Sequence, residues 1–152
     1  MKNKNNLTAI KELRSMCGAG ISDCQKALEE ANGDIKKALA ILRQQGQEIA
    51  AKKAEREARE GVVAAYVHAN QKIGAMVALS CETDFVARTE EFKNLAYELA
   101  MQVAAMAPTS NEELLEQEYI RDPQIKVKEL IAQAVGKIGE NIKIREFIRL
   151  EV

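Results

Sequence analysis

The sequence predicts an α+β protein with an N-terminal three-helix bundle and a small antiparallel three-stranded sheet with helices packed on one face. Apolar residues recur at helical spacing through residues 1–46. Near Gly61 the spacing of apolar residues changes from helical to strand-like. Two strand-like stretches follow, and a third, with alternating apolar residues, covers residues 142–150. We therefore expect a bundle at 1–46, a helical linker at 47–61 and an α+β core at 62–152.

Three short helices account for the bundle. The first spans residues 8–16, where apolar side chains form one stripe. Ser22 and Gln25 have the spacing of a capping box, which would open the second helix. Asp34 can cap the third helix, and Gly46 can end it. Few of the side chains are large, so a bundle of this size is marginally stable by itself.

Charges nearly cancel in the linker and over the whole chain. Residues 47–60 mix basic and acidic side chains, the net charge is −1 and aromatic residues make up 4%. Neither a phosphate-binding surface nor a base-stacking platform is therefore expected, and an RNA-binding segment is the weaker interpretation of the linker. No apolar leader and no run of about 18 apolar residues is present, which predicts a cytoplasmic protein without a membrane span.

The core begins with a predicted hairpin of two strands, at residues 62–68 and 74–81. A helix follows over Thr89–Met106, with apolar residues at helical spacing. Residues 110–113, Ser-Asn-Glu-Glu, read as a capping box for a short helix. Another apolar stripe predicts a helix over residues 127–138, which the next glycine would stop.

The last strand has alternating apolar and polar residues. Ile144, Ile148 and Leu150 fall on one side of a regular strand, and Glu146 is the polar residue on that same side. We therefore expect a twist or a bulge at Glu146. A sheet of only three strands also has exposed edges.

An acid and an aromatic residue, Asp84 and Phe85, stand in the connection between the second strand and the helix that follows. The chain has only three Phe residues and no Trp. Connections run over the surface and often carry function. Two interpretations stay open: the ring of Phe85 projects outward to bind a partner, or it folds back into the local core, as most aromatic residues do.

Residues for covalent chemistry are scarce. His68 is the one histidine, no nucleophile and acid can be assigned to it, and its role stays open. Cys17, Cys24 and Cys81 lack C-x-x-C spacing, which favours reduced cysteines over a disulfide framework or a zinc site. Gly18-Ala19-Gly20 lacks the lysine and the preceding strand of a P-loop. We expect no enzymatic activity, no catalytic residue, no metal ion and no cofactor.

Two stretches resemble the elongation factor Ts family, the guanine-nucleotide exchange factors of the translational GTPase elongation factor Tu. The first is Gly74-Ala75-Met76-Val77-Ala78-Leu79-Ser80-Cys81-Glu82-Thr83-Asp84-Phe85-Val86-Ala87-Arg88. The second is similar to the ubiquitin-associated type of bundle that begins these proteins, and it consists of Leu13-Arg14, Cys17-Gly18-Ala19-Gly20, Asp23-Cys24-Gln25-Lys26-Ala27-Leu28 and Gly33-Asp34. The chain departs from the family in having Cys17 where Thr is usual and Ile21-Ser22 where a pair of Met is common.

The resemblance implies a nucleotide-exchange mechanism. Phe85 would wedge into the GTPase domain of elongation factor Tu, with a polar contact from Asp84 beside it. The wedge would displace elements that hold Mg²⁺ and the GDP phosphates, and the chain would stabilise the nucleotide-free GTPase. The implied partner-binding residues are Thr83, Asp84, Phe85 and Val86 of the connection, and Arg14, Ile21 and Ser22 of the bundle.

Longer members of the family carry a second related subdomain, so this chain is expected to form a homodimer through its sheet. The alternative function is a polypeptide-binding adaptor that uses the ubiquitin-associated-like bundle, with a core that only dimerises. A small enzyme is a third hypothesis, but it lacks a ligand site. Only the exchange factor would lose its GTPase partner on addition of GDP.

Overall fold

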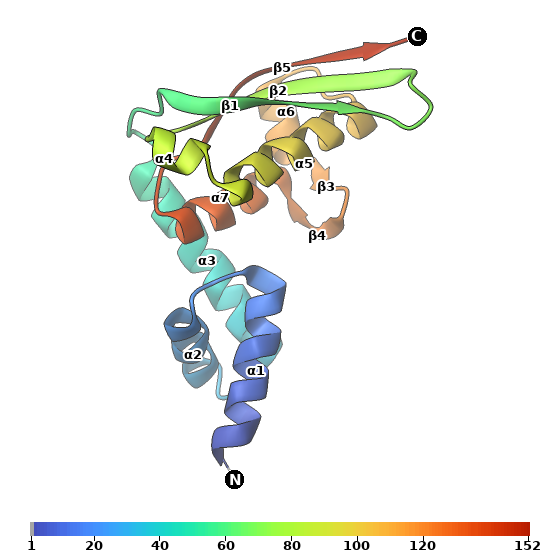
Figure 1. Ribbon diagram of the computed structural model, residues 1–152. Helices are drawn as coiled ribbons and strands as arrows, with labels where there is room; N and C mark the ends of the chain where they lie inside the picture. The colour runs from blue at the N-terminus through green and yellow to red at the C-terminus, as the bar shows by residue number, and fades with distance from the viewer. Residues whose placement is uncertain (1) are drawn as a thin grey trace. The chain divides into compact units, whose positions relative to one another are not determined.

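The computed structural model describes residues 2–152, with side chains from Leu7 onward. The chain divides into two compact units, which are Met1–Lys52 with Ala132–Gly139, and Lys53–Ile131 with Glu140–Val152. The first unit is helical and the second contains the sheets (Figure 1). The predicted α+β class, with a helical N-terminal part and an antiparallel three-stranded sheet, is confirmed.

Three helices from the N-terminal part of the chain form most of the first unit: α1 (Lys2–Cys17), α2 (Ile21–Glu30) and α3 (Ile35–Lys53). Small and medium side chains fill its core, as the sequence predicts. These are Ile10, Leu13, Cys24, Ala27, Leu28, Ala31, Ala38, Leu39 and Leu42. Asp34 caps α3 as predicted, because its Oδ1 accepts hydrogen bonds from the backbone N–H groups of Lys36 (3.0 Å) and Lys37 (3.1 Å).

The start of α2 differs from the sequence-based expectation. The helix begins at Ile21 with Gly20 as its N-cap, and no side chain caps it. The predicted capping box of Ser22 and Gln25 is therefore wrong. Gly18 takes a positive φ of 67° just before this start, a conformation that glycine adopts without strain. The chain thus enters α2 earlier than the box would place it.

The end of α3 also differs, because the helix continues through Gly46 to Lys53. The prediction that Gly46 ends it is wrong for a tertiary reason. Gly46 lies against the second half of α7 (Val127–Ile138), and a Cβ built on Gly136 would lie only 3.3 Å from the Gly46 Cα. The missing side chains let the two helices approach closely, which offsets the low helix propensity of glycine.

The second unit is built on a three-stranded antiparallel sheet in the order β1-β2-β5. Its strands are β1 (Glu60–Val67), β2 (Ile73–Cys81) and β5 (Lys143–Glu151). Helix α5 (Glu90–Met106) lies along one face of this sheet (Figure 1), with Phe92, Leu99 and Val103 fully buried. The predicted hairpin, the long helix and the third strand are confirmed.

Four short elements complete the second unit: α4 (Asp84–Ala87), α6 (Asn111–Glu116), β3 (Glu118–Tyr119) and β4 (Asp122–Lys126). Ser110 caps α6, as predicted, by accepting from the Glu113 N–H at 3.1 Å. The β3–β4 ribbon was not predicted. Buried Gln102 supports it, because its amide donates to the Glu118 carbonyl (3.0 Å) and accepts from the Ile120 N–H (2.9 Å).

A bulge interrupts the pairing of β2 with β5. Ala78 pairs with Glu146 and Leu79 pairs with Ile144, so Arg145 is the additional residue. The bulge expected at Glu146 is therefore confirmed. Its effect on the faces of the strand was not foreseen, since an additional residue reverses the alternation beyond it.

Side chains on either side of the bulge point to opposite faces. Ile144 pairs with buried Leu79, whereas Ile148 pairs with exposed Met76. Ile148 is 54% exposed and Leu150 is 71% exposed. The expectation that Ile144 shares a face with Ile148 and Leu150 is therefore wrong, and the sheet carries apolar side chains on its outer face.

Gly61 in β1 generates a prediction about stability. A Cβ at this position would overlap the Leu79 carbonyl oxygen and lie 2.8 Å from the Ser80 Cα. Backbone atoms cannot move aside cheaply, so Gly61→Ala should lower the free energy of unfolding by about 1–3 kcal/mol, measured by urea denaturation. The matched control is Gly74→Ala, whose Cβ would be an ordinary 3.4 Å from the nearest atom. Equal stability of the two variants would contradict the close approach.

Candidate functional site

The residues singled out from the sequence fall into two groups in separate units. Thr83, Asp84, Phe85 and Val86 lie on one turn at the end of β2, in the second unit. Arg14, Ile21 and Ser22 lie at the end of α1 and the start of α2, in the first unit. The structure thus brings the members of each group together along the chain, on two separate surfaces.

Phe85 is the most exposed aromatic side chain of the turn and of the described chain, at 79% of its full accessible area. It occupies the second position of α4, whose Ala87 points inward and is buried. The Asp84 carboxylate forms an ion pair with the Arg88 guanidinium at 2.7 Å. The interpretation that Phe85 folds back into the local core is therefore wrong.

Two threonines define the ends of α4. The Thr83 Oγ1 accepts from the Val86 N–H at 3.4 Å, which caps the start. The Thr89 hydroxyl donates to the Val86 carbonyl at 2.8 Å and accepts from the Phe92 N–H at 3.3 Å, at the start of α5. These caps satisfy backbone groups that a single helical turn would leave open. The turn therefore has one defined conformation.

Glu140 attaches this turn to the body of the second unit. Its Oε2 accepts from the backbone N–H groups of Glu82 and Thr83, both at 3.0 Å. Its Oε1 accepts from the Thr83 hydroxyl at 2.6 Å. Hydrogen bonds to a carboxylate are stronger than neutral ones. One side chain thus holds both residues that precede Asp84.

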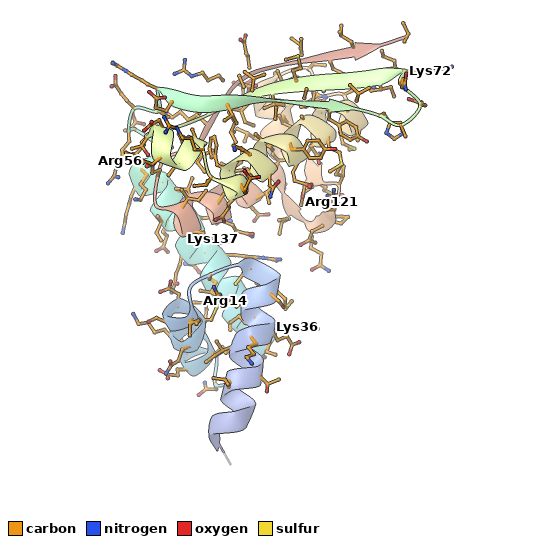
Figure 2. All side chains as sticks on the ribbon, in the orientation of Figure 1. Arg14, Lys36, Arg56, Lys72, Arg121 and Lys137 are labelled. Atoms are coloured by element: carbon orange, nitrogen blue, oxygen red, sulfur yellow. The ribbon has the colours of Figure 1, made fainter. Side chains whose placement is uncertain are left out.

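Asn141 extends this attachment to the segment after α3. Its backbone N–H donates to Glu82 Oε1 at 2.8 Å, and its side-chain amide donates to the carbonyls of Ala54 (3.2 Å) and Arg56 (2.7 Å). Arg56, labelled in Figure 2, also pairs with Glu82 at 3.7 Å. The buried amide of Asn141 is satisfied by these contacts, which fix residues 54–56 beside the turn.

Sequence reasoning missed Glu140 and Asn141. They follow Gly139, whose positive φ of 86° ends α7, and no short motif marks them. Their partners at the turn lie 57 to 59 residues earlier, and the Ala54 and Arg56 carbonyls lie 87 and 85 residues before Asn141. The one signal in the sequence was that two polar residues, Glu140 and Asn141, stand between the glycine that ends a helix and an apolar strand.

Cys81 lies beneath the turn and is not a nucleophile. Its side chain is fully buried and its thiol donates to the Thr83 carbonyl at 3.2 Å. Burial, followed by the nearby Glu140 charge, raises the pKa of the Cys81 thiol to about 11. The thiol therefore stays protonated at neutral pH and serves in packing.

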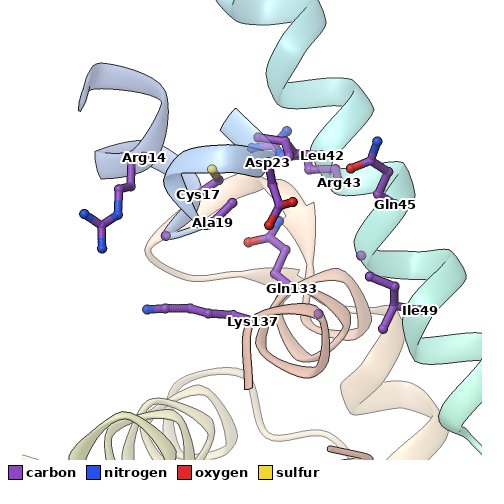
Figure 3. A pocket seen from close by; sticks show the side chains of 14 residues that line it. Arg14, Cys17, Ala19, Asp23, Leu42, Arg43, Gln45, Ile49, Gln133 and Lys137 are labelled. Atoms are coloured by element: carbon purple, nitrogen blue, oxygen red, sulfur yellow. The ribbon is translucent and has the colours of Figure 1, made fainter. Parts of the chain in front are cut away.

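The second surface lies at one end of the bundle. Ile21 is 57% exposed, and Arg14 and Ser22 are exposed beside it along the chain. Arg14 also lines a hollow of about 370 Å³ together with the Gly18–Gly20 loop. Figure 3 shows Lys137 extending along this loop, and a Cβ on Gly18 would lie 3.2 Å from its Nζ. The surface combines apolar and basic groups.

The described residues offer little for covalent or metal chemistry. Among the side chains from Leu7 onward, no group of three or more His, Cys, Asp or Glu residues could hold a metal ion. The His68 ring shares a hydrogen bond with the Tyr66 hydroxyl, with the two atoms 2.9 Å apart, and Tyr66 packs edge-on against Tyr97. None of the helices described in residues 2–152 has the length and apolarity that crossing a membrane requires.

Comparisons with known proteins identify relatives over nearly the whole chain. The family model described as Elongation factor TS matches residues 82–152. Elongation factor Ts of Carboxydothermus hydrogenoformans is 44% identical, with 94% of this chain and 87% of the relative covered. Elongation factor Ts of Thermotoga maritima is 44% identical, with 97% and 96% covered. The latter alignment runs over 190 positions, more than the 152 residues of this chain, so the relative contains residues within the matched region that are missing here.

Glu140→Ala tests the attachment of the turn. The variant removes the acceptor of three hydrogen bonds, and the Glu82 and Thr83 amides would then open more often to solvent. Their hydrogen-exchange rates, measured by NMR, should rise at least about tenfold, which corresponds to about 1.4 kcal/mol. Glu140→Gln keeps one acceptor oxygen and should be intermediate. Unchanged rates in Glu140→Ala would show that the turn is held by other contacts.

Proposed function

Because the chain belongs to the elongation factor Ts family, a family of translation elongation factors, we propose that it promotes GDP release from elongation factor Tu. It would displace the contacts that hold Mg²⁺ and the phosphates of GDP, and then stabilise the nucleotide-free GTPase. The observation that carries this proposal is the exposed Phe85 ring on a turn held at both ends. On this proposal the chain acts in the cytoplasm by binding and carries out no covalent step.

The size of the Phe85 ring is sufficient for the proposed effect. Docking such a ring removes about 150–250 Å² from water, worth roughly 4–6 kcal/mol at about 25 cal/mol per Å². Each tenfold change in nucleotide affinity requires about 1.4 kcal/mol. Bound Mg²⁺ is often the largest local charge in a phosphate site. A wedge that disturbs the ligands of Mg²⁺ therefore has enough free energy to lower the affinity for GDP by two or three orders of magnitude.

The neighbours of Phe85 would set the position of the wedge. Asp84 is half-buried and pairs with Arg88 in the free chain, and this surface pair is weak enough to be exchanged for a donor on the GTPase. Thr83 and Val86 would contact the partner on either side of the ring. Arg14, Ile21 and Ser22 of the first unit would supply a second contact on the same domain.

The proposal includes a homodimer formed through the outer face of the sheet. Apolar residues from all three strands lie side by side there in the strand register, and most of them are exposed. These residues, the outer-face patch, are Val63, Ala65, Val67, Met76, Ala78, Ile148 and Leu150. Monomeric proteins rarely leave a large contiguous apolar patch in water. A second copy would cover it by sheet-on-sheet packing around a two-fold axis.

Phe85→Ala tests the wedge. The variant should reduce the stimulated rate of GDP release by about 100-fold or more, since most of the burial free energy of the ring is lost. The measurement is stopped-flow release of a fluorescent GDP from elongation factor Tu at increasing concentrations of the chain. The control is Met106→Ala, which removes an exposed apolar side chain at the end of α5 in the same unit.

Two outcomes would contradict the proposed function. Wild-type exchange by Phe85→Ala would show that the ring is not the wedge. A wild-type chain that leaves GDP release unchanged, yet captures polypeptides regardless of nucleotide, would favour the adaptor.

Ile148→Lys tests the homodimer. A lysine on β5, within the outer-face patch, would place a charge in the apolar interface, and sedimentation velocity at micromolar concentration should then give a monomer where the wild type gives a dimer. The matched control is Leu7→Lys, which changes an exposed apolar residue of α1 in the first unit. A monomeric wild type, or a dimeric Ile148→Lys, would refute this interface.

A further inference from the structure

Strand β1 forms one edge of the three-stranded sheet, and its free side has no neighbouring strand within residues 2–152 (Figure 1). The His68 N–H donates to the Ile73 carbonyl at 2.8 Å, in register with the pairs of β1 and β2. In an antiparallel pair every second residue bonds to the neighbouring strand, so alternate residues from Glu60 to Tyr66 also bond to β2. The residues between them direct their N–H and C=O groups toward the free edge, and these are Gly61, Val63, Ala65 and Val67.

The backbone groups along this edge lack partners within the part of the chain that the structure describes. No backbone hydrogen bond outside the regular elements reaches these four residues, and all four are exposed. An unpaired strand edge is a template for another strand, which proteins commonly block with lysine, proline or a bulge. β1 has none of these, because its one charged residue is Glu60 at its start and its pairing with β2 is regular. The edge is therefore open for pairing.

The opposite edge of the sheet, formed by β5, is protected instead. A bulge interrupts the pairing of β5 with β2. Charged side chains also recur along this strand, and they are Lys143, Arg145, Glu146, Arg149 and Glu151. Both features discourage the addition of a further strand. An additional strand is therefore expected at β1 and not at β5.

We propose that β1 pairs with β1 of a second copy of this chain, antiparallel around a two-fold axis at Ala64, so that two sheets join edge to edge. This register places Val63 opposite Ala65 of the second copy. It also places Gly61 opposite Val67 of the second copy. Each of these residues directs its N–H and C=O groups to the free edge, so each pair exchanges two hydrogen bonds. Every backbone group along the edge is then satisfied.

The ends of β1 are complementary in this register, which favours a second copy over another extended segment. Glu60 lies opposite His68 of the second copy, and the two-fold axis repeats this contact. The His68 Nδ1 is 2.9 Å from the Tyr66 hydroxyl, which leaves Nε2 to donate to a carboxylate. Both Glu60 and His68 are exposed. A carboxylate and an imidazole thus meet at each end of the junction.

Side chains on both faces also fit the junction. On the outer face, the members of the outer-face patch from β1 continue into those of the second copy. On the other face, Ala64 meets Ala64 of the second copy at the axis. The Cα atoms of such a non-hydrogen-bonded pair approach to about 4.5 Å, and the small side chain of Ala64 permits this. Val62 then lies opposite Tyr66 of the second copy.

Edge pairing and the proposed face-to-face dimer use different surfaces of the same sheet, so they are compatible. Ile148→Lys, which removes the face-to-face contact, isolates the edge. A junction made by one strand from each copy is small, and small interfaces are weak. We therefore expect the Ile148→Lys chain to be a monomer at micromolar concentration and to dimerise through β1 at about 0.1–1 mM.

A disulfide trap tests the register. Ala64→Cys is introduced into a chain that carries Ile148→Lys and also Cys17→Ala, which removes the partly exposed native thiol. The two new cysteines are direct neighbours across the axis, whereas those of the control, Val62→Cys, are four positions out of register. Oxidation at about 0.5 mM should link Ala64→Cys chains at least about tenfold faster than Val62→Cys chains, because a disulfide requires close Cβ atoms. Equal rates would overturn the register.

A charge exchange tests whether the partner is a second copy. In the Ile148→Lys chain, His68→Glu places two carboxylates opposite each other and should weaken the association about tenfold. Adding Glu60→Lys should restore it. The two positions lie about 26 Å apart within one chain, at about 3.3 Å for each of eight residues, so only contact between copies can restore the association.

The measurement for the charge exchange is sedimentation equilibrium between about 10 µM and about 1 mM, a range that covers weak association. The matched control is Gln124→Glu, which adds the same charge on exposed β4 and should leave the association unchanged. A monomeric Ile148→Lys chain at the highest concentration, or a double variant as weak as His68→Glu, would overturn the edge pairing. Neither result bears on GDP release, so failure of the edge pairing is distinguishable from failure of the proposed function.

Discussion

The carboxylate of Glu140 is the contact on which the candidate site depends. It accepts hydrogen bonds from two backbone N–H groups and one hydroxyl at the end of β2, from a position 57 to 58 residues later in the chain. Without an acceptor there, the N–H groups of Glu82 and Thr83 would turn to water and the turn would loosen. An apolar ring on a loose turn could collapse onto nearby apolar surface. On a fixed turn, Phe85 stays exposed.

The short helix α4 then decides which side chains face water. The caps at Thr83 and Thr89 limit it to a single turn, in which Ala87 is buried and Phe85 projects outward. A larger residue in place of Ala87 would push the turn away from the sheet. Because the conformation of the turn exists before any partner arrives, little of the burial free energy of the ring is spent on ordering it.

The sequence predicts what depends on neighbours along the chain and misses what depends on distant contacts. Apolar spacing locates the helices and the hairpin, and the polar Glu146 within an apolar alternation locates the bulge in β5. The prediction that Gly46 ends α3 fails because the close approach of Gly46 to α7 offsets the low helix propensity of glycine. The capping-box prediction at Ser22 fails because the N-cap of α2 is Gly20, two residues earlier. The exposure of Phe85 follows from the family resemblance, whereas the role of Glu140 requires the folded chain.

Reciprocity explains why a fixed, exposed ring suits an exchange factor, on the function proposed for this chain. If docking of Phe85 lowers the affinity of elongation factor Tu for GDP by a given factor, then bound GDP lowers the affinity of elongation factor Tu for this chain by the same factor. A ring that had to be ordered on binding would lose part of its burial free energy, and the coupling would shrink with it. The hydrogen bonds of Glu140 and the caps of α4 are made within the chain before binding, so they do not reduce the coupling. The hydrogen bonds of Glu140 and the caps of α4 therefore have two effects. They keep the Phe85 ring exposed in the free protein, and they leave its full burial free energy available for coupling in the complex.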